Sequence, residues 1–158
     1  MIRIAVFVTI LLATLLYALK KGGGPERAMA LILIAMLLAD QCLHLFIPPR
    51  FNGVDMGHLL IDLLAAAATF GLAMTAHRFW PMPAAVLQIL PLMAHMGKAI
   101  DLSVHPFAYL TMQVAAAWVL PPLLALATWR HQMRLPTSGT DRSWYLSWRS
   151  SNQRSASR

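Results

Sequence analysis

Apolar residues fill five long runs of the chain, separated by short polar segments. A helix that crosses a membrane needs about 20 apolar residues, and each run approaches that length. None of the runs alternates apolar and polar positions as the strands of a membrane barrel do. The pattern therefore predicts an all-α membrane protein, a compact bundle of about five transmembrane helices. The predicted spans are about 2–19, 28–47, 54–76, 79–100 and 106–128.

The segments at 20–27 and 48–50 combine charge with helix breakers, and the polar pair His77-Arg78 closes the third run. The three consecutive glycines of the first segment predict a flexible turn. Because short connections join antiparallel neighbours, residues 1–129 are predicted to form one five-helix transmembrane domain. Ser and Arg dominate residues 130–158, which predicts a basic, disordered cytoplasmic tail.

Composition narrows the class of protein further. Apolar residues make up 58% of the 158-residue chain and charged residues only 12%, whereas soluble domains have about a quarter charged residues. This excludes most soluble enzymes and disordered proteins. The net charge of +7 is better explained by contacts with anionic lipid than by nucleic acid, which is not expected as a partner. The single cysteine, Cys42, excludes an intrachain disulfide.

Basic residues are concentrated on one side of the predicted bundle. The loop after the first run and the C-terminal tail are rich in Lys and Arg, the loop after the third run holds Arg78, and five spans would place all three segments on one side. The positive-inside rule then predicts a multi-pass protein of a bacterial-type inner membrane, with the N-terminus outside and the C-terminus in the cytoplasm.

Polar residues gather toward the predicted outer ends of the runs. Asp40 and His44 are four residues apart, so they share a helix face. Asp55, His58 and Asp62 form a stripe by the same argument. Charged groups are costly in lipid, so these side chains are expected to face inward and to pair. For Asp62 the expected partners are Lys98 and His44. The predicted polar cluster consists of Asp40, His44, Asp55, His58, Asp62, His95, Lys98, Asp101 and His105.

Three interpretations of this cluster remain open. It is a structural network that fixes which helices meet, a divalent-metal site, or a site for proton relay or for a small polar ligand or quinone. Imidazole and carboxylate ligands suit zinc, or copper if Met93 and Met96 join. Haem is not expected, because no histidine pair lies deep enough in the predicted membrane. The predicted metal ligands are His44, His58, Asp62 and His95.

No phosphate-binding loop or nucleophile motif occurs, so an enzyme is not the favoured class. The sequence predicts a small inner-membrane protein whose outward-facing Asp/His cluster binds a metal ion, a proton or a small polar ligand. The alternative is a non-catalytic accessory or assembly subunit of a membrane complex. The chain also resembles holins in size and charge, which would imply a phage membrane protein. Expected partners are the lipid bilayer and either another membrane protein or a second copy of the chain.

Overall fold

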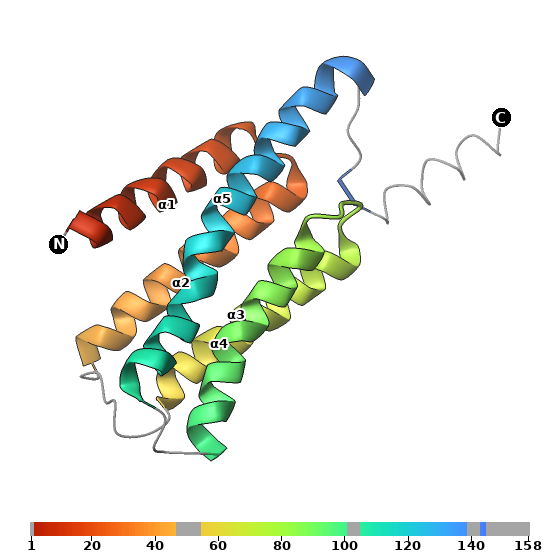
Figure 1. Cartoon of the computed structure of the whole chain (residues 1–158). Helices are drawn as coiled ribbons and strands as arrows, with labels where there is room; N and C mark the ends of the chain where they lie inside the picture. The colour runs from red at the N-terminus through yellow and green to blue at the C-terminus, as the bar shows by residue number, and fades with distance from the viewer. Residues whose placement is uncertain (1, 47–54, 101–104, 139–142, 145–158) are drawn as a thin grey trace.

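The computed structural model is an all-helical bundle (Figure 1). It describes residues 2–46, 55–100, 105–138 and 143–144. Outside the helices, a single β-bridge joins Ala76 to Trp144 in this part of the chain. The elements in chain order are α1 (Ile2–Lys21), α2 (Gly24–Phe46), α3 (Met56–Thr75), α4 (Pro81–Ile100) and α5 (Pro106–Ser138).

The helices form a closed ring in which each packs against the next and α5 returns to α1. A further contact between α2 and α5 crosses the ring. Figure 1 shows that the C-terminal ends of α2 and α4 and the N-terminal ends of α3 and α5 lie at the same end of the bundle. We call this the polar end, because the described Asp and His residues of the predicted cluster lie on or next to these ends of the helices.

Four helical segments of the described chain are long and apolar enough to cross a membrane: α1, α2, α3 and Phe107–Pro136 of α5. The predicted all-α class is confirmed. The helix at 79–100 also exists, but α4 is not among these four, because Gln88, His95 and Lys98 make it more polar. All three side chains are buried, so its polar groups face the bundle. A crossing by α4 stays a prediction.

Large apolar side chains cover the outside of the bundle, and its interior combines many small residues with a few large ones such as Met29 and Leu124. Leu31, Phe70 and Val119 are among many that are exposed, whereas Ala18 and Ala30 are completely buried. In water, so much exposed apolar surface would promote association, but it suits contact with lipid. Small interior residues let helices approach closely, as in known membrane bundles.

Two helix boundaries differ from the prediction. α2 begins at Gly24, not at 28, because a proline at the second residue is compatible with a first helical turn. α5 continues to Ser138, whereas the predicted span ends at 128 and the predicted tail begins at 130. Leu124, Thr128 and His131 are buried one turn apart, so the inward face of α5 persists after the composition turns polar.

A second polar group, the Glu26 cluster (Glu26, Arg78, Trp80 and His131), lies at the opposite end of the bundle. Trp80 Nε1 donates to Glu26 Oε1 at 3.0 Å, and Arg78 Nε lies 4.0 Å from the same oxygen. Arg78 Nη2 is 3.4 Å from His131 Nδ1. Glu26 has no exposed surface, so this charge is part of the core. The cluster ties the start of α2 to the α3–α4 loop and to α5.

The glycines before Glu26 form a close-packed corner instead of a flexible turn. A Cβ on Gly22 would clash with the carbonyl of Ala18, and one on Gly24 would lie 2.7 Å from the indole nitrogen of Trp144. Glycine is therefore required here by the close approach of other groups, which the sequence pattern alone does not reveal.

Candidate functional site

Asp55 begins the site, because it caps α3 and orients a histidine at the same time. Its Oδ1 accepts hydrogen bonds from the backbone N–H groups of Gly57 at 3.0 Å and His58 at 3.2 Å, as an N-cap does. Its Oδ2 lies 2.9 Å from His58 Nδ1. Burial raises the pKa of the Asp55 carboxyl, but the hydrogen bonds and charge from His58 and the Gly57 N–H outweigh burial and bring this pKa below 3.8.

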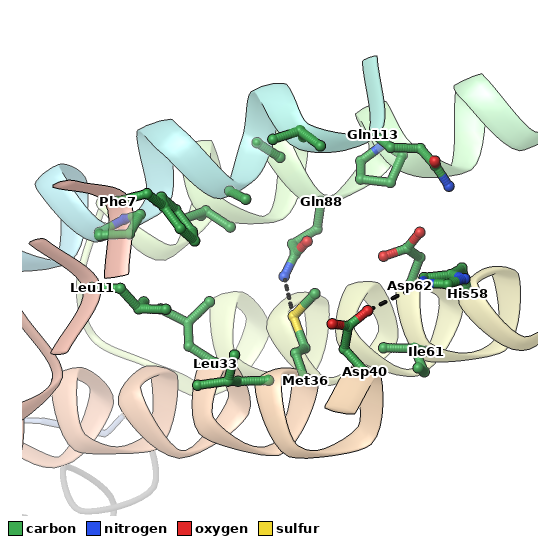
Figure 2. A pocket seen from close by; sticks show the side chains of 17 residues that line it. Phe7, Leu11, Leu33, Met36, Asp40, His58, Ile61, Asp62, Gln88 and Gln113 are labelled. Atoms are coloured by element: carbon green, nitrogen blue, oxygen red, sulfur yellow. Dashed lines mark hydrogen bonds and ion pairs between the residues drawn. The ribbon is translucent and has the colours of Figure 1, made fainter. Parts of the chain in front are cut away.

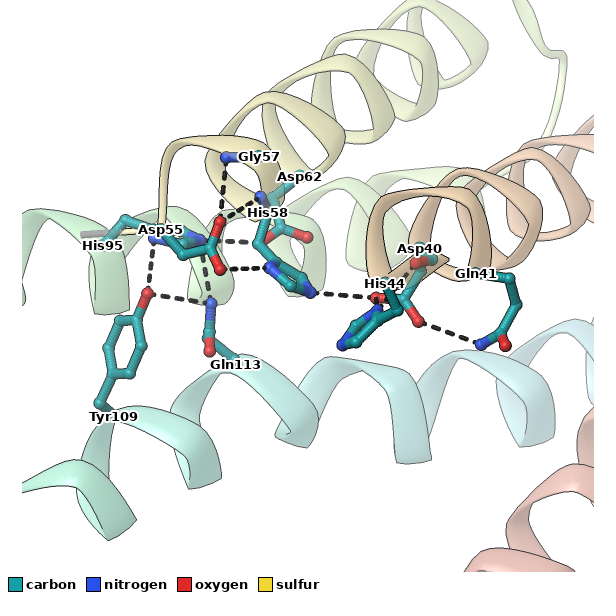
Figure 3. Close-up of polar contacts among 10 residues, drawn as sticks. All are labelled: Asp40, Gln41, His44, Asp55, Gly57, His58, Asp62, His95, Tyr109 and Gln113. Atoms are coloured by element: carbon teal, nitrogen blue, oxygen red, sulfur yellow. Dashed lines mark hydrogen bonds and ion pairs between the residues drawn. The ribbon is translucent and has the colours of Figure 1, made fainter. Parts of the chain in front are cut away.

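Three side chains from two helices converge next to this cap (Figure 3). We call Asp40, His44 and His58 the Asp/His triad. His58 Nε2 lies 3.1 Å from Asp40 Oδ1, and His44 Nδ1 lies 3.6 Å from the same oxygen. One possible ligand atom from each residue lies within 4.8 Å of the others, a spacing that would accommodate a metal ion. The two imidazole rings meet edge to face, with centroids 5.2 Å apart.

The hydrogen bonds of the triad determine which imidazole nitrogens are free for a metal. His44 Nδ1 lies 2.8 Å from the backbone carbonyl of Asp40. A carbonyl oxygen only accepts, so Nδ1 must carry the proton and Nε2 is left as the basic nitrogen. Asp55 accepts from His58 Nδ1 in the same way, but His58 Nε2 also lies 3.1 Å from Asp40 Oδ1, which can only accept, so this nitrogen donates to Asp40. His44 therefore offers Nε2 directly, whereas a metal at His58 would replace the proton on Nε2.

A second group of side chains, the Asp62–His95–Tyr109 chain, joins α3, α4 and α5. His95 Nε2 donates to Asp62 Oδ2 at 3.1 Å, and the Tyr109 hydroxyl lies 2.9 Å from His95 Nδ1. Gln113 Nε2 lies 3.2 Å from the Tyr109 hydroxyl and 3.0 Å from His95 Nε2. His95 is 2% exposed, so this group is part of the bundle interior.

The structure divides the predicted metal ligands between these two groups. His44 and His58 belong to the Asp/His triad, whose third member is Asp40. Asp62 and His95 instead bind each other. The expectation that Asp62 has a partner from another helix is met by His95, a residue that was not among its expected partners.

The remaining residues of the predicted cluster are Lys98, Asp101 and His105. Lys98 is buried on α4. His105 is exposed and accepts a hydrogen bond from the Phe107 N–H at 3.2 Å, next to the start of α5. Asp101 lies outside the described residues. Met93 and Met96 are exposed on α4, whose buried face carries His95.

Both groups border one cavity in the middle of the bundle (Figure 2). The cavity has a volume of about 350 Å³ and is lined by residues of all five helices. Asp40 and His58 reach it from the triad, and Asp62 and Gln113 reach it from the second group. The cavity therefore has a polar part at the polar end and an apolar part deeper in the bundle.

Sequence reasoning missed part of this arrangement. The spacing of Asp40 and His44 predicts that they share a face, but Asp40 was not among the predicted metal ligands. The Glu26 cluster was missed because Glu26 and Arg78 were assigned to loops. The one available signal was Pro25 before Glu26, since a proline followed by an acid is typical of a first helical turn.

Comparison of the chain with protein-family models, with curated proteins and with solved structures finds no match, so the geometry of the site carries its interpretation.

Proposed function

We propose that this protein is a multi-pass membrane protein that binds one divalent transition-metal ion at Asp40, His44 and His58. The observation that carries the proposal is the convergence of their ligand atoms within 4.8 Å of one another. Two imidazoles and one carboxylate form a donor set typical of zinc. A thiolate or thioether set would instead favour Cu(I).

The surroundings of His58 support this proposal. Histidines that bind metals almost always donate their second N–H to a carboxylate or carbonyl, which fixes the ring and raises its basicity. Asp55 holds His58 Nδ1 at 2.9 Å, and the Asp40 carbonyl holds His44 Nδ1 at 2.8 Å. Both histidines therefore already have the second contact that a metal ligand needs.

Three protein ligands leave a coordination position for water or another small ligand, as in zinc sites that are not purely structural. Binding requires both imidazoles to be neutral, because a metal and a proton compete for Nε2. We expect zinc affinity to fall on acidification, because protons compete with the metal for its ligand atoms.

We also propose an orientation. Lys20 and Lys21 end α1 at the end of the bundle opposite the triad, and Arg78 follows α3 there. Under the positive-inside rule this end faces the cytoplasm of a bacterial-type inner membrane. The triad would then face the periplasm.

Zinc binding to the purified, EDTA-treated protein in detergent, measured by isothermal titration calorimetry, tests the proposal. We expect one zinc per chain, and a loss of affinity of at least tenfold in His44→Gln and Asp40→Asn. His105→Gln is the matched control, because His105 is exposed and outside the triad. If wild type binds no zinc, or both triad variants bind as wild type does, the Asp/His contacts are structural. An accessory or assembly subunit is then the better explanation.

A further inference from the structure

The central cavity changes character along its length. Its polar part is lined by Asp40, His58, Asp62 and Gln113, and Gln88 crosses its middle (Figure 2). Beyond Gln88 the lining is apolar and comes from α1, α2 and α5. The apolar lining includes Phe7, Leu11, Leu33 and Leu120. A volume of about 350 Å³ lies within the range of about 300–1,000 Å³ seen for small-molecule sites.

The hydrogen bonding of Gln88 indicates that the cavity binds a ligand. Its side chain is 99% buried and lines the cavity, yet among the described residues its hydrogen-bond partner is the Met36 sulfur, at 3.3 Å. A thioether is a weak acceptor. Buried amides are almost always fully hydrogen-bonded in proteins. The Gln88 carbonyl accepts no hydrogen bond from the described residues, so it is available to a bound molecule.

The other polar groups of the cavity also offer acceptors. Gln113 donates through its amide nitrogen to the Tyr109 hydroxyl, which leaves its carbonyl oxygen. Asp62 uses Oδ2 for His95, which leaves Oδ1. A molecule that fits must therefore donate hydrogen bonds. A negatively charged head group would meet the carboxylates of Asp40 and Asp62 and is disfavoured.

We propose that the cavity binds one uncharged, single-chain amphiphile with a hydroxyl head. The hydroxyl donates to the acceptors around Gln88 and Gln113, and the hydrocarbon chain lies among the apolar side chains of α1, α2 and α5. This ligand is additional to the proposed metal ion and does not depend on it. A free long-chain alcohol and a hydroxyl-headed lipid share this chemistry.

Radiolabelled 1-dodecanol binding to the protein in phospholipid nanodiscs, with EDTA present, tests the proposal. Subtracting the signal of empty nanodiscs removes partitioning into lipid. We expect saturable binding of one molecule per chain and no saturable binding of dodecanoate. Unlabelled 1-monolauroylglycerol should compete if a hydroxyl-headed lipid also fits; if it does not compete, the ligand is a free alcohol.

Two variants test whether the ligand binds in the cavity. Ala117→Phe fills the apolar part and should weaken binding at least tenfold, whereas Ala67→Phe makes the same change on an exposed face of α3 and should not. Gln88→Leu removes the amide and should weaken binding about three- to tenfold. If Ala117→Phe does not fold, Gln88→Leu alone tests whether the ligand binds in the cavity. Binding that never saturates, or that is equal in wild type and in the folded cavity variants, would overturn the proposal. Equal binding of dodecanoate would overturn the assigned head group.

Discussion

At the scale of single residues, the two carboxylate oxygens of Asp55 have separate functions. Oδ1 caps α3 through the N–H groups of Gly57 and His58, and Oδ2 holds the His58 ring. The first contact contributes to stability and the second to the metal site. Because the functions belong to different atoms, substitutions can separate them.

Asp55→Asn keeps an oxygen for the cap but presents an N–H₂ group to His58 Nδ1, which is itself a donor. We expect this variant to keep most of its stability and to lose zinc affinity by about 10–100-fold. Asp55→Ala should lose the same affinity and also about 1 kcal/mol of stability. Calorimetric zinc titrations and urea unfolding of both variants measure the two effects. Wild-type zinc affinity in Asp55→Asn would show that the carboxylate does not support the site.

The lowered pKa of Asp55 also predicts a pH dependence of stability. Since the folded value lies below 3.8, the stability that the carboxylate contributes is complete above that pH and is lost as the pH falls through the folded pKa. Asp55→Asn has no such titration. The difference in thermal midpoint between wild type and Asp55→Asn, both without metal, should therefore shrink as the pH is lowered from about 5 to about 3. A difference that does not shrink over this range would contradict the assigned shift.

At the scale of the helices, apolar runs were enough to predict all five elements but not how each is rotated. The predicted and observed limits of α1, α3 and α4 agree to within a few residues. The end of α5 was predicted too early, because the prediction relied on composition, which turns polar after residue 128. The buried positions Leu124, Thr128 and His131 show that the inward face of the helix continues. The cluster was predicted from spacing within single helices. Which partners meet across helices, such as Asp62 with His95, depends on helix rotation, which spacing does not determine.

The Glu26 cluster predicts how helix ends are held together. Trp80→Phe removes the indole N–H that Glu26 accepts at 3.0 Å and should cost about 1 kcal/mol. Glu26→Ala removes a buried carboxylate from its Trp80 and Arg78 contacts and should cost about 3 kcal/mol or more. Arg27→Gln is the neighbouring control, because Arg27 is exposed, and should change stability by less than about 0.5 kcal/mol. Unfolding in detergent compares the three, and equal losses would mean that the cluster is not part of the core.

At the scale of the whole molecule, the bundle places two different polar groups at its two ends with an apolar surface between them. The proposed orientation follows from the charges near the Glu26 end, not from the Asp/His triad. The proposed orientation and the proposed metal site are thus independent, so a result against the orientation would not count against the metal site.

The orientation predicts the side of the membrane on which each terminus lies. A green fluorescent protein fused after Arg158 should fluoresce in bacterial cells, and alkaline phosphatase fused at the same position should be inactive, because it folds only outside the cytoplasm. Alkaline phosphatase fused before Met1, behind a cleaved signal peptide, should be active and serves as the control. The reverse pattern would place the triad on the cytoplasmic side.

The central claim is that Asp40, His44 and His58 bind one metal ion, and X-ray absorption at the zinc edge tests it most directly. The purified protein is loaded with one equivalent of zinc and passed through a desalting column. We predict that zinc stays bound, with imidazole ligands at about 2.0–2.1 Å, and that His44→Gln shows one imidazole fewer. Zinc that is lost on desalting, or a spectrum that His44→Gln leaves unchanged, would contradict the account.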